Sequence, residues 1–238
     1  MKVQMNQRRL VNFFVVAAGL VLLVMAAADA MQLVKAGAFN NQTEAYLDFW
    51  REQQKKQPDE FQLKPRNYDI ALQGAEQALA ALPDSPEQWV LKARVEDWGR
   101  QYGLLQSGDE NDSESVQENP LLDTWHHAIA LRPAWPYAWS DYAMARAQFS
   151  LIDAEFETAL FRANQLGPWE ERVLENSALL GMHYHDWLSQ PLQATLQDSL
   201  QRLTERYPYK AVSIARRYGR ADELCPWLSN PERVRECL

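Results

Sequence analysis

A phrase that the chain uses twice constrains its fold more than any other feature. It reads Leu-Pro-Asp-Ser-Pro-Glu-Gln-Trp at Leu82–Trp89 and Arg-Pro-Ala-Trp-Pro-Tyr-Ala-Trp at Arg132–Trp139. In both copies a second proline follows the first proline by three residues, and a tryptophan follows the first proline by six residues. Repetition at this scale is typical of stacked helical arrays, in which each unit buries its apolar face only against its neighbours. Such arrays usually bind other molecules rather than transform them.

Small residues keep a fixed distance from the repeated prolines. An alanine stands five residues before each first proline and another ten residues after it, and a looser third copy surrounds Pro168. Helices that cross at close range need small side chains at the contact and a bulky one beside it. The predicted packing residues are Ala78, Trp89, Ala93, Trp125, Ala128, Trp139, Ala143, Ala163 and Ala178, with Leu174 in the large position of the third copy.

The N-terminal residues predict a membrane anchor. Three basic residues precede Leu10–Ala28, a run of nineteen residues whose only polar side chain is Asn12. A helix of that length covers about 28 Å, close to the thickness of the hydrocarbon layer. Because the positive charges lie before the run and Asp29 follows it, we expect a cytoplasmic N-terminus and an exported remainder. For a bacterial cell this means a single-pass inner-membrane protein with its bulk in the periplasm.

A cleaved signal peptide is the competing interpretation of the same segment. Ala28-Asp29-Ala30 fits the small-x-small cleavage pattern. The apolar run is, however, longer than the ~7–15 residues usual in signal peptides, which favours a retained anchor. Under both interpretations the rest of the chain is exported.

The remaining sequence predicts helices and no sheet, since no period-two alternation persists anywhere. We expect a cytoplasmic N-terminus at 1–9, an anchor at 10–28, a juxtamembrane helix and linker at 29–66, and a helical array at 67–238. Ser85 is a candidate helix cap before Pro86. The segment 106–119 is rich in Asp, Glu, Ser and Gly, and is predicted to be an acidic loop inserted in the array.

The net charge limits the class of partner, and the cysteine content predicts a disulfide. The chain has a net charge of −8, and residues 1–30 carry +2, so the exported part carries −10. An acidic domain repels nucleic acid, and none is expected as a partner. Cys225 and Cys237 are the only cysteines, and in an exported protein they predict a disulfide that holds down the C-terminus. Closing a loop of this length stabilises the fold by about 3 kcal/mol. Two unpaired thiols are the alternative.

No arrangement of reactive residues predicts catalysis. The histidines come as His126-His127 and His183-x-His185, spacings that do not place two ligands on one helix face, so no metal is expected. Nucleophile motifs and phosphate-binding glycine loops are missing, and no cofactor is expected. Paired carboxylates such as Glu155 and Glu157, or Glu170 and Glu171, are expected on solvated helix faces. The chain is therefore predicted not to be an enzyme.

Three aromatic residues outside the packing positions are candidates for binding. Trp135 and Tyr137 lie at one predicted helix start and Trp169 at the next, and consecutive starts should share one edge of an array. Aromatic faces stack on sugar rings, and they also anchor protein interfaces. Burial in the core is the competing expectation for each.

The repeated unit resembles the tetratricopeptide repeat over residues 67–181, with proline near the unit's end and alanine at the crossing positions. It departs from that pattern at Glu96, Arg146 and Gly181, where a tyrosine is usual. The resemblance implies an all-α fold, an α-solenoid of helical hairpins behind a transmembrane helix.

A narrower resemblance comes from the anchor, the array and the phrases Ala-Leu-Arg-Pro-Ala-Trp-Pro-Tyr-Ala-Trp and Leu-Gly-Pro-Trp-Glu. Together they are similar to the VpsP-type proteins of exopolysaccharide biosynthesis. This implies a non-catalytic scaffold or accessory protein that binds protein partners of polysaccharide assembly or export. A direct glycan-binding module and a general assembly factor of the cell envelope are the alternatives.

Overall fold

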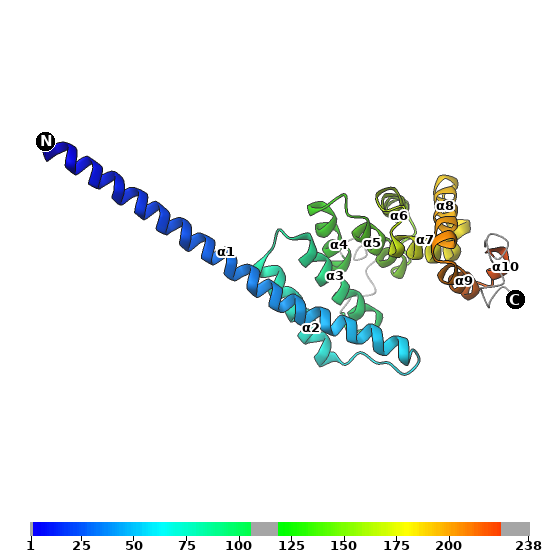
Figure 1. Ribbon diagram of the computed structural model, residues 1–238. Helices are drawn as coiled ribbons and strands as arrows, with labels where there is room; N and C mark the ends of the chain where they lie inside the picture. Colours follow the sequence, from blue (N-terminus) through cyan, green and yellow to red (C-terminus); the bar gives the residue numbers. More distant parts are fainter. Residues whose placement is uncertain (1, 106–118, 225–238) are drawn as a thin grey trace. The chain divides into compact units, whose positions relative to one another are not determined.

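The computed structural model describes residues 2–105 and 119–224 (Figure 1). All regular structure among these residues is helical and no strand occurs there, which confirms the all-helical prediction. The elements are α1 Lys2–Lys56, α2 Pro65–Ala81, α3 Pro86–Gln101, α4 Pro120–Leu131, α5 Pro136–Gln148, α6 Ala154–Leu166, α7 Glu171–Tyr184, the 3-10 turn η1 His185–Trp187, α8 Gln190–Arg206, α9 Pro208–Arg217 and α10 Ala221–Leu224.

Helix α1 is one unbroken helix of 55 residues, drawn in blue in Figure 1. Its apolar N-terminal part is long and hydrophobic enough to cross a membrane, and it is the one such helix in the described part of the chain. The side chains there face outward, and Phe13 and Leu23 are both more than 60 % exposed. The helix continues past Asp29 because its first proline, Pro58, comes only after Lys56.

The second half of α1 belongs to a folded core rather than to a separate juxtamembrane segment. Ala36, Thr43, Leu47 and Trp50 are at most 1 % exposed and lie where α1 packs against α2 and α3. The Thr43 hydroxyl donates a hydrogen bond of 3.3 Å to the carbonyl of Ala71 on α2. The predicted division between a juxtamembrane helix and an array starting at residue 67 therefore does not correspond to a boundary in this core.

An ion pair and two close glycine contacts complete the packing of α1, α2 and α3. Arg94 on α3 donates two hydrogen bonds, of 2.5 and 2.9 Å, to the carboxylate of Glu44 on α1. Gly74 on α2 faces Thr43, and Gly99 on α3 faces the ring of buried Tyr68. A side chain at either glycine would overlap its neighbour, so these glycines set how closely the helices approach.

The chain divides into two compact units at the predicted acidic insertion, between residues 105 and 106. Nearly all of that insertion, residues 106–118, lies outside the described residues. In the second unit each helix packs against the next, and α5, α6 and α7 also pack against the helix after that. Thus α5 contacts α4, α6 and α7, while α7 contacts α5, α6, α8 and α9.

The helix starts follow the sequence with one correction. Prolines begin α2, α3, α4, α5 and α9, as the fixed φ of proline favours. Ser85 was predicted to cap α3, but its side chain makes no cap hydrogen bond and donates instead to Glu87 at 2.9 Å. Asn119 and Asp153 do cap, accepting from backbone N–H groups at the starts of α4 and α6. The predicted helix near residues 230–237 lies outside the described residues.

Candidate functional site

The repeated prolines mark one recurring turn. The residue before each proline ends a helix with nearly the same backbone angles: φ/ψ is −136/72 at Leu82, −141/74 at Arg132, −133/59 at Gly167 and −135/61 at Tyr207. A residue before proline is excluded from the helical region, which explains why each helix ends there. In every case the N–H three residues later donates to this residue's carbonyl, at 3.0 to 3.2 Å.

The two tryptophans of the repeated phrase make the same hydrogen bond. The indole N–H of Trp89 donates to the carbonyl of Pro83, and that of Trp139 donates to the carbonyl of Pro133, both at 2.8 Å. Each ring is half-buried and folds back over the turn that precedes its helix. The repeated phrase therefore has a structural role, since the hydrogen bond from the tryptophan stabilises the proline turn.

The other predicted packing residues lie in helix contacts. All six alanines and Trp125 are at most 2 % exposed. They are Ala78, Ala93, Ala128, Ala143, Ala163 and Ala178, and Leu174 of the third copy is likewise buried. Two of the residues that replace the usual tyrosine, Glu96 and Arg146, are buried charged side chains.

In the second unit three turns lie side by side and form what we call the turn edge, residues 132–137, 167–172 and 207–210. A Cβ on Gly167 would come within 2.7 Å of the ring of Pro136, so the first two turns are in close contact. The Tyr137 hydroxyl donates to Glu170, which raises the pKa of Tyr137. Lys210 pairs with Glu171 and connects the second turn to the third.

The three candidate binding residues all lie on the turn edge, and an arginine lies over each ring. The guanidinium carbon of Arg132 is 5.0 Å from the ring centroid of Trp135. The corresponding distances are 4.8 Å from Arg172 to Tyr137 and 5.8 Å from Arg202 to Trp169. Trp135 and Tyr137 are half-buried, whereas Trp169 is 52 % exposed. Trp169 is therefore the candidate with the most ring surface available to a partner.

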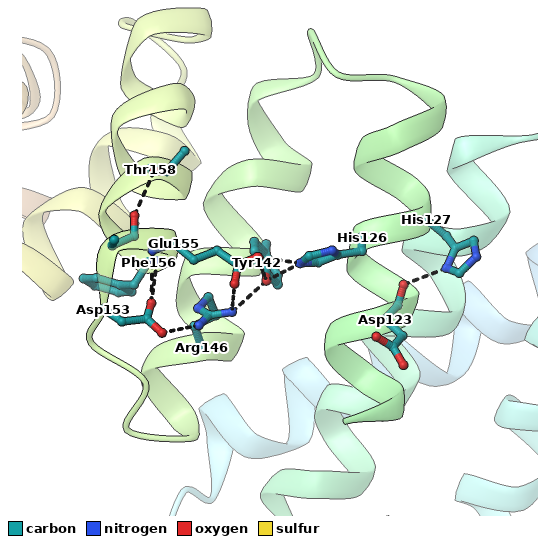
Figure 2. Close-up of polar contacts among 10 residues, drawn as sticks. Asp123, His126, His127, Tyr142, Arg146, Asp153, Glu155, Phe156 and Thr158 are labelled. Atoms are coloured by element: carbon teal, nitrogen blue, oxygen red, sulfur yellow. Dashed lines mark hydrogen bonds and ion pairs between the residues drawn. The ribbon is translucent and has the colours of Figure 1, made fainter. Parts of the chain in front are cut away.

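A second polar cluster joins α4, α5 and α6, and Figure 2 shows it. Arg146, at 6 % exposure, donates from Nη1 to the Tyr142 hydroxyl at 2.9 Å and to Glu155 at 2.6 Å, and from Nη2 to Asp153. Tyr142 donates to Glu155 at 2.7 Å. The imidazole Nε2 of His126 on α4 contacts both the Tyr142 hydroxyl and the Glu155 carboxylate.

The protonation equilibria of this cluster follow from its contacts. Burial and the hydrogen bond to Glu155 raise the pKa of Tyr142, which stays neutral and donates. Burial alone would raise the pKa of Asp153, but the N–H of Phe156 and the guanidinium of Arg146 lower it. These contacts tie α4, α5 and α6 together around the Arg146 guanidinium.

The other three histidines and Glu157 have local or structural contacts. His127 Nδ1 lies 2.9 Å from the carbonyl of Asp123, and His185 Nδ1 lies 3.0 Å from the carboxylate of Asp186. His183 packs edge-on against the ring of Tyr184. Glu157 accepts from the N–H and hydroxyl of Ser189, both at 2.6 Å. In the part of the chain that the structure describes, no group of three or more His, Cys, Asp or Glu is arranged to hold a metal ion.

Two surface features were not identified from the sequence. Trp187 in η1 is 74 % exposed, and no repeat position marked it. A cavity of about 440 Å³ lies between α7 and α8, with Met182, Leu196 and Leu200 among its walls. Of the predicted site residues only Ala178 lines it. The predicted disulfide between Cys225 and Cys237 lies outside the described residues.

The described residues thus define an all-helical protein with one apolar N-terminal helix that is long enough to span a membrane. No protein-family model matches the chain, and no curated protein matches it either.

Proposed function

We propose that this chain is a membrane-anchored, non-catalytic scaffold that holds partner proteins of a cell-envelope assembly. The observation that carries the proposal is the continuity of α1, which runs from an exposed apolar segment directly into a buried core. If the first half of α1 spans the membrane while its second half is part of a folded core, the helix keeps the folded part next to the membrane. A retained anchor fits this arrangement better than a cleaved peptide, because α1 has no break at Ala28-Asp29-Ala30.

The array part of the proposal is a tetratricopeptide-like solenoid. It is supported by the recurring proline turn, by the buried alanines at the expected positions, and by the contacts of α5, α6 and α7 with the next two helices. Such arrays present an extended surface for binding rather than a catalytic pocket. The pathway, polysaccharide synthesis or export, is supported by the resemblance of the two sequence phrases alone.

Co-purification tests the scaffold role. The tagged full-length protein is isolated from membranes in mild detergent, together with Trp169→Ala on the turn edge and Trp187→Ala as a matched exposed tryptophan elsewhere. We expect envelope proteins to accompany the wild type and the Trp187→Ala control, and to be reduced at least tenfold with Trp169→Ala. Isolation of the protein without any partner would contradict the scaffold role.

Membrane retention is measured separately. We expect the protein to resist alkaline carbonate extraction and its mature N-terminus to retain residues 10–28. A mature chain starting near Ala30 or Met31 would show that the segment is a signal peptide and would overturn the anchor.

Direct glycan binding is the second candidate, favoured by the exposed ring of Trp169 with Arg202 beside it. Sugar rings stack on indole faces, and a guanidinium offers donors to ring hydroxyls or carboxylates. Gel mobility in the presence of exopolysaccharide purified from the source cells tests it. We expect retardation that Trp169→Ala removes and Trp187→Ala preserves; equal retardation of both variants would refute this candidate.

A further inference from the structure

The cavity between α7 and α8 is too large to be a packing defect. It has a volume of about 440 Å³, whereas voids inside a well-packed fold rarely exceed the size of a water molecule. Clefts that hold small molecules in proteins have volumes of about 300–1,000 Å³. The cavity lies along the C-terminal half of α7, whereas the turn edge lies at the start of that helix. It is therefore a separate candidate for ligand binding.

The repeat explains why this space is open. Three residues after the small alanine of the first helix in each copy come Glu96, Arg146 and Gly181. Glu96 and Arg146 put large side chains into the fold, and they are 4 and 6 % exposed. Gly181 lines the cavity, and a Cβ there would meet the side chain of Leu196 on α8 at 3.1 Å. The third copy thus has no side chain at a position that the first two copies fill.

The walls of the cavity divide into an apolar floor and a polar rim. Four apolar residues of the floor are at most 6 % exposed: Ala178, Leu188, Leu196 and Leu224. The rim carries three more exposed glutamines of α8, Gln190, Gln193 and Gln197, whose spacing of three and four residues places them on one helix face. This division favours a ligand with an apolar body and a polar group at one end, because each part then meets a surface of its own kind.

The charge at the cavity is positive. The described residues that line it include Arg220 and His185 but no aspartate or glutamate, although the whole chain carries −8. His185 Nδ1 lies 3.0 Å from Asp186, and the amide of Gln193 donates to the carbonyls of His185 and Leu188 at 2.8 and 3.0 Å, so this part of the rim is held in place. A guanidinium pairs with a carboxylate through two parallel hydrogen bonds. A carboxylate is therefore the polar group that this rim fits best.

We propose that the cavity binds a small amphiphilic carboxylate, a molecule of the fatty-acid type with one carboxylate and an apolar chain. The chain packs against Met182, Leu196 and Leu200, and the carboxylate pairs with Arg220. A peptide fits less well, because helical arrays bind peptides along surfaces that several units share, whereas this cavity lies at one pair of helices. The site goes beyond the scaffold role and does not depend on it.

Isothermal titration with octanoate tests the site on the full-length protein. All variants are titrated in the same mild detergent, so that uptake of octanoate by micelles is common to every sample and the differences report on the protein. Ala194 lines the cavity and is exposed, so Ala194→Phe fills the cavity without overpacking a core. Gln201→Phe places the same ring two turns further along α8, outside the cavity. We expect one octanoate per chain for the wild type and for Gln201→Phe, and at least about tenfold weaker binding for Ala194→Phe.

Replacement of the arginine tests the class of ligand. Arg220→Gln removes the charge at the cavity, whereas Arg217→Gln removes an exposed neighbouring charge that does not line it. We expect octanoate to bind about tenfold more weakly to Arg220→Gln and unchanged to Arg217→Gln, as the loss of one charge-assisted pair implies. Octanamide has the same chain and no charge. It should bind equally to Arg220→Gln and to the wild type, which shows that the cavity is intact in the variant.

Each remaining outcome counts against the proposal or for it. Absence of octanoate binding by the wild type, or equal binding by the wild type and Ala194→Phe, overturns the site. Equal affinity of the wild type for octanoate and octanamide overturns the carboxylate and leaves an apolar ligand. Should Arg220→Gln bind neither probe, a tenfold preference of the wild type for octanoate over octanamide still supports the proposal. None of these results depends on whether partner proteins co-purify.

Discussion

Replacement of Gly74 by alanine tests whether the second half of α1 is part of the fold. In most helices a glycine-to-alanine change stabilises by about 0.5–1 kcal/mol, because alanine loses less backbone freedom on folding. At Gly74 the new Cβ would lie 2.5 Å from Oγ1 of Thr43, well inside the contact distance. Thr43 is completely buried against α2, so its side chain has no free space to move into.

The clash outweighs the gain in helix propensity. Overpacking of a well-filled core costs about 1–3 kcal/mol. Rotation of Thr43 away from Gly74 would break its hydrogen bond to Ala71, which adds about 1 kcal/mol for a buried hydroxyl left unsatisfied. After subtraction of the propensity gain, we expect Gly74→Ala to destabilise the packing of α1 on α2 by about 2 kcal/mol. Gly37→Ala is the matched control, since nothing lies within 4 Å of its Cβ.

Amide hydrogen exchange of the full-length protein in detergent measures the effect where it occurs. About 2 kcal/mol corresponds to roughly thirtyfold faster exchange of the α2 amides when opening is local. Gly37→Ala should leave these amides unchanged or slow them. Thr43→Ala combined with Gly74→Ala should exchange more slowly than Gly74→Ala alone, because the clash is removed. If Gly74→Ala protects α2 as an ordinary helix substitution does, the assignment of α1 to this core is wrong.

Three further predictions concern the second unit. Trp139→Phe removes the hydrogen bond to Pro133 from a half-buried ring and should cost about 1 kcal/mol in thermal unfolding. Trp125→Ala empties a fully buried site and should cost about 3–5 kcal/mol, measured by denaturant unfolding. The pKa of Asp153 is lowered in the fold, so its contribution is present above the unfolded value of about 3.9 and is lost as the pH falls through the folded value. Asp153→Asn should therefore reduce stability at neutral pH by weakening the contact with Arg146, and reduce its dependence on pH below 4, as followed by unfolding at several pH values.

The sequence was a good guide wherever short-range chemistry decides the structure. Proline excludes the preceding residue from the helical region, so Pro83, Pro133, Pro168 and Pro208 located four helix ends directly. The alanines were recognisable because close helix crossings tolerate few other side chains. Figure 1 shows the helices that these signals separate.

Two parts of the structure depend on contacts between distant residues and were not predictable in this way. The array was predicted to start at residue 67, whereas the second half of α1 packs in one core with α2 and α3; helix continuity past residue 28 depends only on the lack of a breaker before Pro58, and not on the change in hydropathy there. The cluster around Arg146 was missed because the side chain occupies a position where repeats usually carry tyrosine. Only the fold brings Glu155 and Asp153 to that guanidinium.

The replacement of tyrosine by Arg146 also explains what Glu155 does in the fold. Glu155 accepts hydrogen bonds from Tyr142 and Arg146 and contacts His126, so its carboxylate joins groups from α4, α5 and α6. The same reasoning applies to Glu170 and Glu171, which bind Tyr137 and Lys210 across the turn edge. Carboxylate pairs that look available in the sequence are thus used to join neighbouring helices, whereas the ring of Trp169 on the turn edge is 52 % exposed.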